Sequence, residues 1–219
     1  MAVSQAGINQ MKKMIGDISA NVIYNGVDTN FYHPELPQPF KKGEPQLLFV
    51  SALRPYKKAS ILIESMPELL KKYPMAHLQI VGTGEEKLAL ESLKKKLKLE
   101  NNVELTGKID DNELKLRYSS CDIYVSASTF EVCPVPTLEA MACGKPLVLF
   151  DIEPHQEIIK ISNAGKIFSF KKNSDFITIL DEVYKNKDSF RTSALKFAKT
   201  HDWKTITKQL IEHFEFLEV

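Results

Sequence analysis

Two glutamates, Glu131 and Glu139, are separated by seven residues in the run T-F-E-V-C-P-V-P-T-L-E-A-M-A-C-G-K-P at 129–146. Each carboxylate offers two acceptor oxygens, which suit a pair of neighbouring hydroxyl groups such as those of a sugar or a ribose. Pro134 cannot lie inside a helix, whereas Pro136 suits a first helical position, so we expect a helix to begin near Pro136. Glu131 then lies on the preceding loop and Glu139 in the first helical turn, with unpaired backbone N–H groups between them that suit a phosphate. The run therefore predicts a site for a sugar nucleotide.

Either glutamate alone has a simpler explanation, because acidic residues are favourable near the positive end of a helix dipole. The longer pattern resembles the nucleotide-sugar-binding domain of the retaining family 4 glycosyltransferases of GT-B fold. That family carries two glutamates at this spacing before a helix reading E-A-x-A-x-G-x-P. The resemblance covers nearly the whole chain, including I-Y-N-G-V-D-T-N-F at 23–31 and L-L-F-V-S-A-L-R-P-Y-K-K at 47–58. Taken locally, Asn25-Gly26 predicts a turn with positive φ at the end of a strand.

The resemblance implies roles for particular residues. Lys57 would contact the donor phosphates and Glu131 would orient the transferred sugar, and these two are the expected catalytic residues. Glu139 would hold the ribose, and Ile109 would offer an apolar edge to the nucleobase. The full set of expected donor-binding residues is Arg54, Lys57, Ile109, Glu131, Cys133, Pro134, Val135 and Glu139.

Two departures from the family pattern bear on the site. The arginine that usually precedes the lysine by five positions falls on Ala52, and Arg54, two residues further on, is the candidate to replace it. Family members often carry glycines after the first glutamate, where this chain has 132–134, V-C-P. Because glycine allows close approach of backbone to a ligand, its absence alters which sugar fits or how the amides are presented.

Short apolar runs alternate with helical patterns along the chain, which is typical of βαβ units. The expected fold class is α/β, a doubly wound, Rossmann-like parallel sheet with C-terminal helices, forming one half of a GT-B protein. Its ligand crevice lies at the carboxyl ends of the strands, where Lys57, Glu131 and the loop K-I-D-D at 108–111 each follow a different strand. We expect strands near 46–51, 77–81, 102–105, 122–126, 146–150 and 166–169.

Composition agrees with a globular α/β domain, since 219 residues with 43% apolar content and 26% charge lie close to ordinary usage. The formal charge of +1 offers no strong field for nucleic acid or an anionic membrane, and the lysines at 94–96 predict only a solvated helix face. Three cysteines without C-x-x-C spacing, Cys121, Cys133 and Cys143, indicate neither a disulfide framework nor a zinc site. No apolar run approaches membrane-spanning length and no signal peptide is evident, so we expect a cytoplasmic protein, peripheral at the membrane if associated with it.

The segment D-I-E-P-H-Q-E-I-I at 151–159 stands where many family members have a glycine-rich turn. His155, at a helix start beside a proline, is expected to be exposed or to cap the helix, and contact with a ligand is the alternative that stays open. The other histidines share no spacing typical of a metal site. The chain is helical in pattern from 173 onward, and 197–210 matches the family's terminal helix, with Trp203 as a packing anchor.

The expected domain division is a hinge or trailing helix of a missing acceptor domain at 1–20, a donor-binding domain at 21–190 and returning C-terminal helices at 191–219. The expected function is donor binding for a retaining, metal-independent hexosyltransferase, with no cofactor, that transfers a sugar from a nucleotide-diphospho-sugar to a glycan, lipid-linked or small-molecule acceptor. With the acceptor domain missing, little transfer is expected from this chain alone. Two alternatives stay open: a non-catalytic sugar-nucleotide-binding subunit that needs a separate acceptor subunit, and another enzyme of the same fold, such as an epimerase or a phosphorylase.

Overall fold

A computed structural model describes residues 1–170 and 173–217. Over these residues the chain forms a six-stranded sheet in which every neighbouring pair of strands is parallel. Each predicted strand is present within two residues of its expected bounds, and the α/β fold class is confirmed. The strands are β1 (Gln46–Val50), β2 (His77–Val81), β3 (Val103–Gly107), β4 (Ile123–Ser126), β5 (Leu147–Phe150) and β6 (Gly165–Phe168).

The spatial order of the strands is β3-β2-β1-β4-β5-β6. Strands β2 and β3 are therefore added on one side of β1, and the chain then crosses to the other side of β1, where β4, β5 and β6 follow in order. In open parallel sheets a ligand crevice forms at this reversal, outside the carboxyl ends of the two central strands. The loops after β1 and β4 are consequently the ones best placed to hold a ligand.

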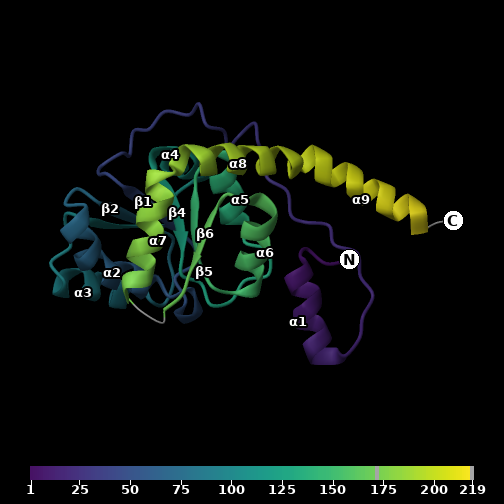
Figure 1. Ribbon diagram of the computed structural model, residues 1–219, viewed down its shortest axis with the longest axis horizontal. Helices are drawn as coiled ribbons and strands as arrows, with labels where there is room; N and C mark the ends of the chain where they lie inside the picture. The colour runs from purple at the N-terminus through teal and green to yellow at the C-terminus, as the bar shows by residue number, and fades with distance from the viewer. Residues whose placement is uncertain (171–172, 218–219) are drawn as a thin grey trace.

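Helices cover both faces of the sheet, and α9 projects away from it (Figure 1). The alternation of side chains along β1 explains the two layers: Leu47 and Phe49 pack with α2 and α7, whereas Leu48 packs with α5 and α8 on the opposite face. The helices are α1 (Gln5–Ile15), η1 (Pro55–Lys57, a 3₁₀ turn), α2 (Ala59–Lys72), α3 (Lys87–Lys96), α4 (Asp111–Ser120), α5 (Val135–Ala142), α6 (Glu153–Ser162), α7 (Asn173–Lys185), α8 (Lys187–Thr200) and α9 (Trp203–Leu217).

Helix α5 begins one residue before the predicted Pro136, with Pro134 as its N-cap residue. Glu131 lies on the preceding loop, as predicted. The prediction that Glu139 lies in the first turn is wrong, because Glu139 is the fifth residue of α5 and the first turn holds no acidic residue. Glu139 is therefore held by its neighbours across the fold rather than by the helix terminus.

The predicted turn at Asn25-Gly26 is also wrong, since Gly26 does not have positive φ. Residues 25 and 26 have no regular secondary structure, and Val27 forms an isolated parallel bridge with Asp202. Glycine is required there for a different reason: a Cβ atom on Gly26 would lie 2.6 Å from Cδ2 of Trp203. Trp203 is thus a packing anchor, as expected, although 47% of its surface stays exposed.

The helix predicted over 197–210 is interrupted. Helix α8 ends at Thr200 and α9 starts at Trp203, because the backbone between them pairs with Val27. The Asp202 carboxylate accepts a hydrogen bond from the Lys204 N–H at 2.9 Å and so caps the first turn of α9. The expected boundary at 190/191 falls inside α8, which packs against α5, and it is α9 that leaves the body of the molecule.

Gly26→Ala is expected to lower the free energy of unfolding by about 1–3 kcal/mol, because the new methyl group overlaps the Trp203 indole. Chemical denaturation of the two proteins measures this difference. The control is the same substitution in a Trp203→Ala background, where the cost should fall toward zero. An equal cost in both backgrounds would show that the indole is not the cause.

Candidate functional site

A cleft of about 390 Å³ lies at the carboxyl ends of the neighbouring strands β1, β2 and β3. Its walls come from the ends of β1 and β2 with the loops that follow them, from the loop after β3, and from single residues of α4 and α5. The loops after β1, β2 and β3 therefore meet there, whereas Lys57 and Glu131 are not among the lining residues. The lining residues are Val50, Ser51, Ala52, Val81, Gly82, Thr83, Lys108, Ile109, Leu114 and Pro136.

Lys57 and Glu131 form an ion pair, with the lysine Nζ 2.5 Å from the carboxylate Oε1. The lysine ends the 3₁₀ turn after β1 and the glutamate follows β4, so the pair joins the two loops at the reversal of strand order. The side chains are only 13% and 15% exposed. Two opposite charges are therefore held together, partly shielded from water, where a parallel sheet binds its ligands.

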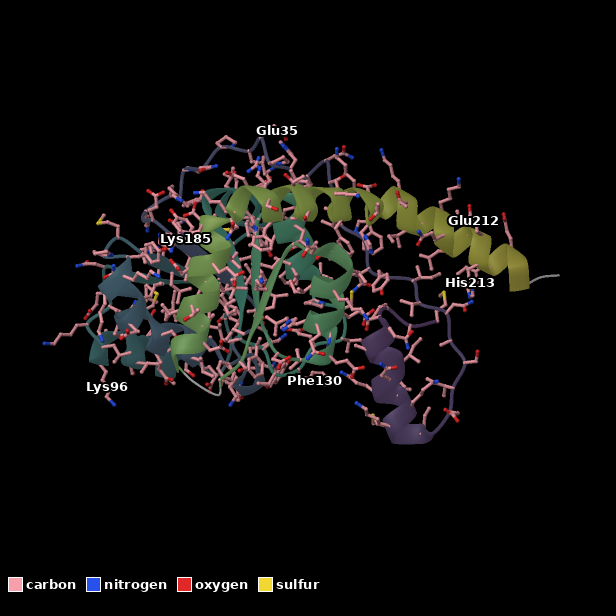
Figure 2. All side chains as sticks on the ribbon, viewed as in Figure 1. Glu35, Lys96, Phe130, Lys185, Glu212 and His213 are labelled. Carbon is pink, nitrogen blue, oxygen red and sulfur yellow. The ribbon has the colours of Figure 1, made fainter. Side chains whose placement is uncertain are left out.

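Backbone contacts fix the two loops that carry this pair. The carbonyl oxygen of Tyr56 accepts hydrogen bonds from both the N–H and the hydroxyl of Thr129, at 2.8 and 2.9 Å. The ring of Tyr56 meets that of Phe130 edge to face, and the Lys57 ammonium lies 5.3 Å from the Tyr56 ring centre. Phe130 is 56% exposed and is labelled near the lower margin of the sheet in Figure 2. The ion pair thus has an apolar, exposed rim.

Glu139 accepts a hydrogen bond from the hydroxyl of Tyr118, at 2.8 Å. It follows Pro136 by three residues, which places it on the side of α5 that reaches the cleft. Burial raises the pKa of the Glu139 carboxyl, while hydrogen bonds from the hydroxyls of Tyr118 and Tyr32 oppose that rise. Both tyrosines were missed from the sequence, since neither spacing nor local pattern links them to Glu139.

The N-terminal segment holds the loop between the glutamates. The hydroxyl of Ser4 donates to the carbonyl of Val132 at 2.7 Å, and the Asn25 side chain donates to the carbonyl of Cys133 at 3.4 Å. The side chains of Cys133 and Pro134 line a cavity of only about 20 Å³ with Ser4, away from the main cleft. These contacts fix the direction of the loop that presents Glu131.

Glu157 of α6 attaches the N-terminal segment to the body of the molecule. Its carboxylate accepts hydrogen bonds from the N–H groups of Gln5 and Ala6, at 2.9 and 2.7 Å, and from the Tyr24 hydroxyl at 2.6 Å. The two amides belong to the first turn of α1, where a negative charge is favourable. Sequence analysis missed this contact, because helix N-termini do not specify which distant carboxylate reaches them.

The remaining predicted residues differ in their exposure and in whether they line the cleft. Ile109 and Ala52 line the cleft, and Ala52 is exposed there. Arg54 is the exposed residue before the 3₁₀ turn, so it borders the same loop as Lys57. Val135, the first residue of α5, is 37% exposed beside the glutamate loop. No side chain caps α5. Pro136 has no N–H and the Thr137 N–H donates to the Pro134 carbonyl at 3.1 Å, so of the first three residues of the helix the Val135 N–H is the one left for an anion.

The prediction that His155 is exposed or caps a helix is wrong, because its side chain is fully buried. The His155 Nδ1 atom lies 2.8 Å from the carbonyl oxygen of Phe150. Burial lowers the pKa of the ring, and Glu131 and Lys57 are the charged groups that act on it. The chain reversal from β5 into α6 turns the residue inward, which the local pattern did not reveal.

Within the described residues, no group of three or more histidine, cysteine or acidic side chains could hold a metal ion. None of the described helices is long and apolar enough to cross a membrane.

Residues 35–201 match the family described as "Glycosyl transferases group 1". An uncharacterised glycosyltransferase of Methanocaldococcus jannaschii is 30% identical over 210 residues, which cover 89% of this chain and 53% of the relative. Phosphatidyl-myo-inositol mannosyltransferase of Mycobacterium leprae is 22% identical over 98% of this chain and 58% of its own length. The chain thus spans little more than half the length of these relatives.

Solved structures share the fold. Sucrose-phosphate synthase of Thermosynechococcus elongatus superposes with a TM-score of 0.85 at 19% identity, over 99% of this chain and 57% of that protein. HepE of Anabaena, solved with UDP and glucose, superposes with a TM-score of 0.84 at 24% identity, over 98% of this chain and 62% of that protein. At these identities the likeness shows the architecture of the sheet and its helices.

Proposed function

Because the chain belongs to the family of group 1 glycosyl transferases, we propose that it binds a nucleotide-diphospho-sugar donor for transfer of the sugar to an acceptor hydroxyl. The observation that carries the proposal is the Lys57–Glu131 ion pair, which joins the loops after β1 and β4 at the reversal of strand order. A lysine suits a diphosphate and a carboxylate suits sugar hydroxyls, so the pair matches the two chemical halves of the reacting group.

In this proposal the nucleoside occupies the cleft, with its base against Ile109 and its ribose hydroxyls on Glu139. The diphosphate extends to Lys57 and to the Val135 N–H at the start of α5, with Arg54 as a further cation. The transferred sugar lies against Glu131 and the loop Cys133–Val135. The volume of about 390 Å³ falls within the range of small-molecule sites, which supports a ligand of this size.

The proposed reaction replaces one bond at the anomeric carbon by another. The bond from that carbon to the diphosphate oxygen breaks, the acceptor oxygen forms the new bond on the same face of the sugar, and the hydroxyl proton leaves toward the diphosphate. Negative charge develops on the leaving diphosphate, where Lys57 and the Val135 N–H would stabilise it. Retention at the anomeric carbon and independence from metal are parts of the proposal.

We further propose that the acceptor, a glycan, a lipid-linked molecule or a small molecule, is held by another domain or subunit. The apolar rim at Tyr56 and Phe130 supports this, because it is exposed beside the ion pair. Without groups that orient the acceptor and exclude water, much of the barrier remains. This chain alone is then expected to bind the donor and to transfer little sugar.

The test is calorimetric titration of the purified chain with UDP-, GDP- and ADP-sugars and the matching diphosphates, with a metal chelator present. Micromolar binding of one base series is the expected result, a value typical of substrate affinities. Binding that disappears with the chelator would contradict the metal-independent part of the proposal. Absence of binding across the panel would contradict donor binding itself.

The second candidate is a non-catalytic sugar-nucleotide-binding subunit. Ala52 favours it, because a neutral methyl group stands where the family places an arginine near the phosphates. Product analysis distinguishes the two: co-expression with an acceptor-binding partner should yield a glycosylated product only if this chain contributes to catalysis.

A further inference from the structure

His155 carries a ring nitrogen whose role the fold does not explain. The Phe150 carbonyl can only accept a hydrogen bond, so the Nδ1 atom, 2.8 Å away, must carry the proton. In the neutral ring the Nε2 atom is then an acceptor with a free lone pair. Burial favours this neutral form, since it lowers the pKa of His155. The tautomer is therefore set by a backbone contact.

The Nε2 atom is buried and has no hydrogen-bond partner within the described structure. Buried polar atoms are nearly always paired in proteins, so an unpaired one calls for an explanation. A second histidine, His77, also has an unpaired ring nitrogen, but the charges acting on it are Glu104, Lys42 and Arg117, far from the cleft in the sheet. For His155 they are Glu131 and Lys57.

The chemistry of these neighbours limits what can pair with Nε2. The Glu131 carboxylate only accepts hydrogen bonds, so it cannot satisfy another acceptor. The Lys57 ammonium already donates to Glu131. His155 lies in the first turn of α6, just after the carboxyl end of β5, and β5 pairs with β4, whose loop carries Glu131. Nε2 and the carboxylate, both acceptors, therefore lie at the same edge of the sheet as the Lys57 ammonium. A group with several hydroxyl donors beside a negative charge complements that arrangement, and a sugar linked to a diphosphate is such a group.

We propose that the His155 Nε2 atom accepts a hydrogen bond from a hydroxyl of the transferred sugar and so helps to select which sugar is bound. The inference rests on the proposed function, because it assigns a further contact in the same site. The contact requires Nε2, which is buried here, to become accessible when the donor binds. Within the family pattern this position lies in the segment that replaces a glycine-rich turn.

The proposal predicts a selective loss of affinity. In His155→Leu the affinity for the sugar nucleotide preferred by the wild type should fall about 10-fold, the effect of one lost hydrogen bond to a buried acceptor, whereas the affinity for the matching diphosphate should change less than about twofold. His155→Gln, whose amide oxygen can accept a hydrogen bond, should lose less. His77→Leu is the matched control, since it removes another buried histidine with an unpaired nitrogen and should leave both affinities unchanged.

Calorimetry with both ligands separates the outcomes. Equal losses for sugar nucleotide and diphosphate would overturn the proposal, because His155 would then act through Lys57 or through the fold. Unchanged affinities would overturn it as well. If the wild type binds neither ligand, the proposed function fails and this inference fails with it.

A second measurement covers the case in which His155→Leu does not fold. In ¹⁵N-histidine-labelled wild-type protein, the Nε2 resonance of His155 should shift on addition of the sugar nucleotide and stay in place with the diphosphate. A shift of equal size with both ligands, or with neither, would contradict a hydrogen bond to the sugar.

Discussion

Lys57→Ala should lower the affinity for a nucleoside diphosphate by about 10- to 100-fold, because it removes a charge-assisted hydrogen bond to phosphate. The lysine is only 13% exposed, so its charge acts on a ligand through less water than a surface charge would. Glu131 would lose its partner, yet the carboxylate keeps some contact with solvent and the fold should persist. Calorimetry with diphosphate and thermal unfolding measure the two effects.

Lys58→Ala is the matched control. Lys58 is the next residue of the same loop, is exposed and forms no ion pair within the described structure. Its removal tests for a general effect of loop charge, which should be less than about twofold and should vanish at high salt. Glu131→Gln should have the opposite effect on diphosphate affinity. The substitution removes the charge that pairs with Lys57, so affinity for diphosphate should hold or rise while selectivity for the sugar is lost. A Lys57→Ala protein that binds diphosphate as tightly as the wild type would refute the phosphate role.

Glu139→Ala should lower nucleotide affinity by a similar factor of about 10 to 100, because a carboxylate that accepts two ribose hydroxyls is a strong contact. The loss should depend on the 2′-hydroxyl of the ribose. Wild type should bind the 2′-deoxy nucleotide much more weakly than the ribonucleotide, and Glu139→Ala should bind the two alike. Inorganic pyrophosphate, which has no ribose, should bind both proteins equally. A competition titration with these three ligands therefore tests the ribose assignment directly.

Stability must be measured alongside, since Glu139 also accepts from the fully buried Tyr118. Removing the carboxylate leaves that hydroxyl without its acceptor, which costs about 1–3 kcal/mol of unfolding free energy. Tyr118→Phe serves as the control, because it removes the hydroxyl and keeps the carboxylate. If Tyr118→Phe reproduces the whole loss of nucleotide affinity, the effect of Glu139 is one of positioning and the ribose contact is wrong.

The strands and the placement of the glutamate loop could be predicted because their signals are local. A buried parallel strand such as Gln46–Val50 is apolar nearly throughout, so its sequence alone indicates a strand. A proline in the first turn of a helix likewise indicates where the helix starts. The errors arose where a distant segment overrides the local signal. Gly26 lies against Trp203 and forms no turn, and the C-terminal helix is interrupted because the chain at Asp202 pairs with Val27. Asp202, a favourable N-cap residue, was the available clue to that interruption.

The sequence by itself determined the family, the parallel α/β architecture and the two side chains, Lys57 and Glu131, that meet at the reversal of strand order. Those follow from residue types and spacing, which local backbone preferences and the rules of strand connection convert into positions. Only the tertiary structure decided which groups surround the site: Tyr118 beneath Glu139, Ser4 on the glutamate loop and the buried ring of His155. The Tyr118–Glu139 contact joins residues 21 positions apart and the Ser4–Val132 contact residues 128 positions apart, while His155 bonds to a carbonyl of the preceding strand, five positions away. Each of these hydrogen bonds depends on how the folded elements pack, which no local sequence pattern encodes.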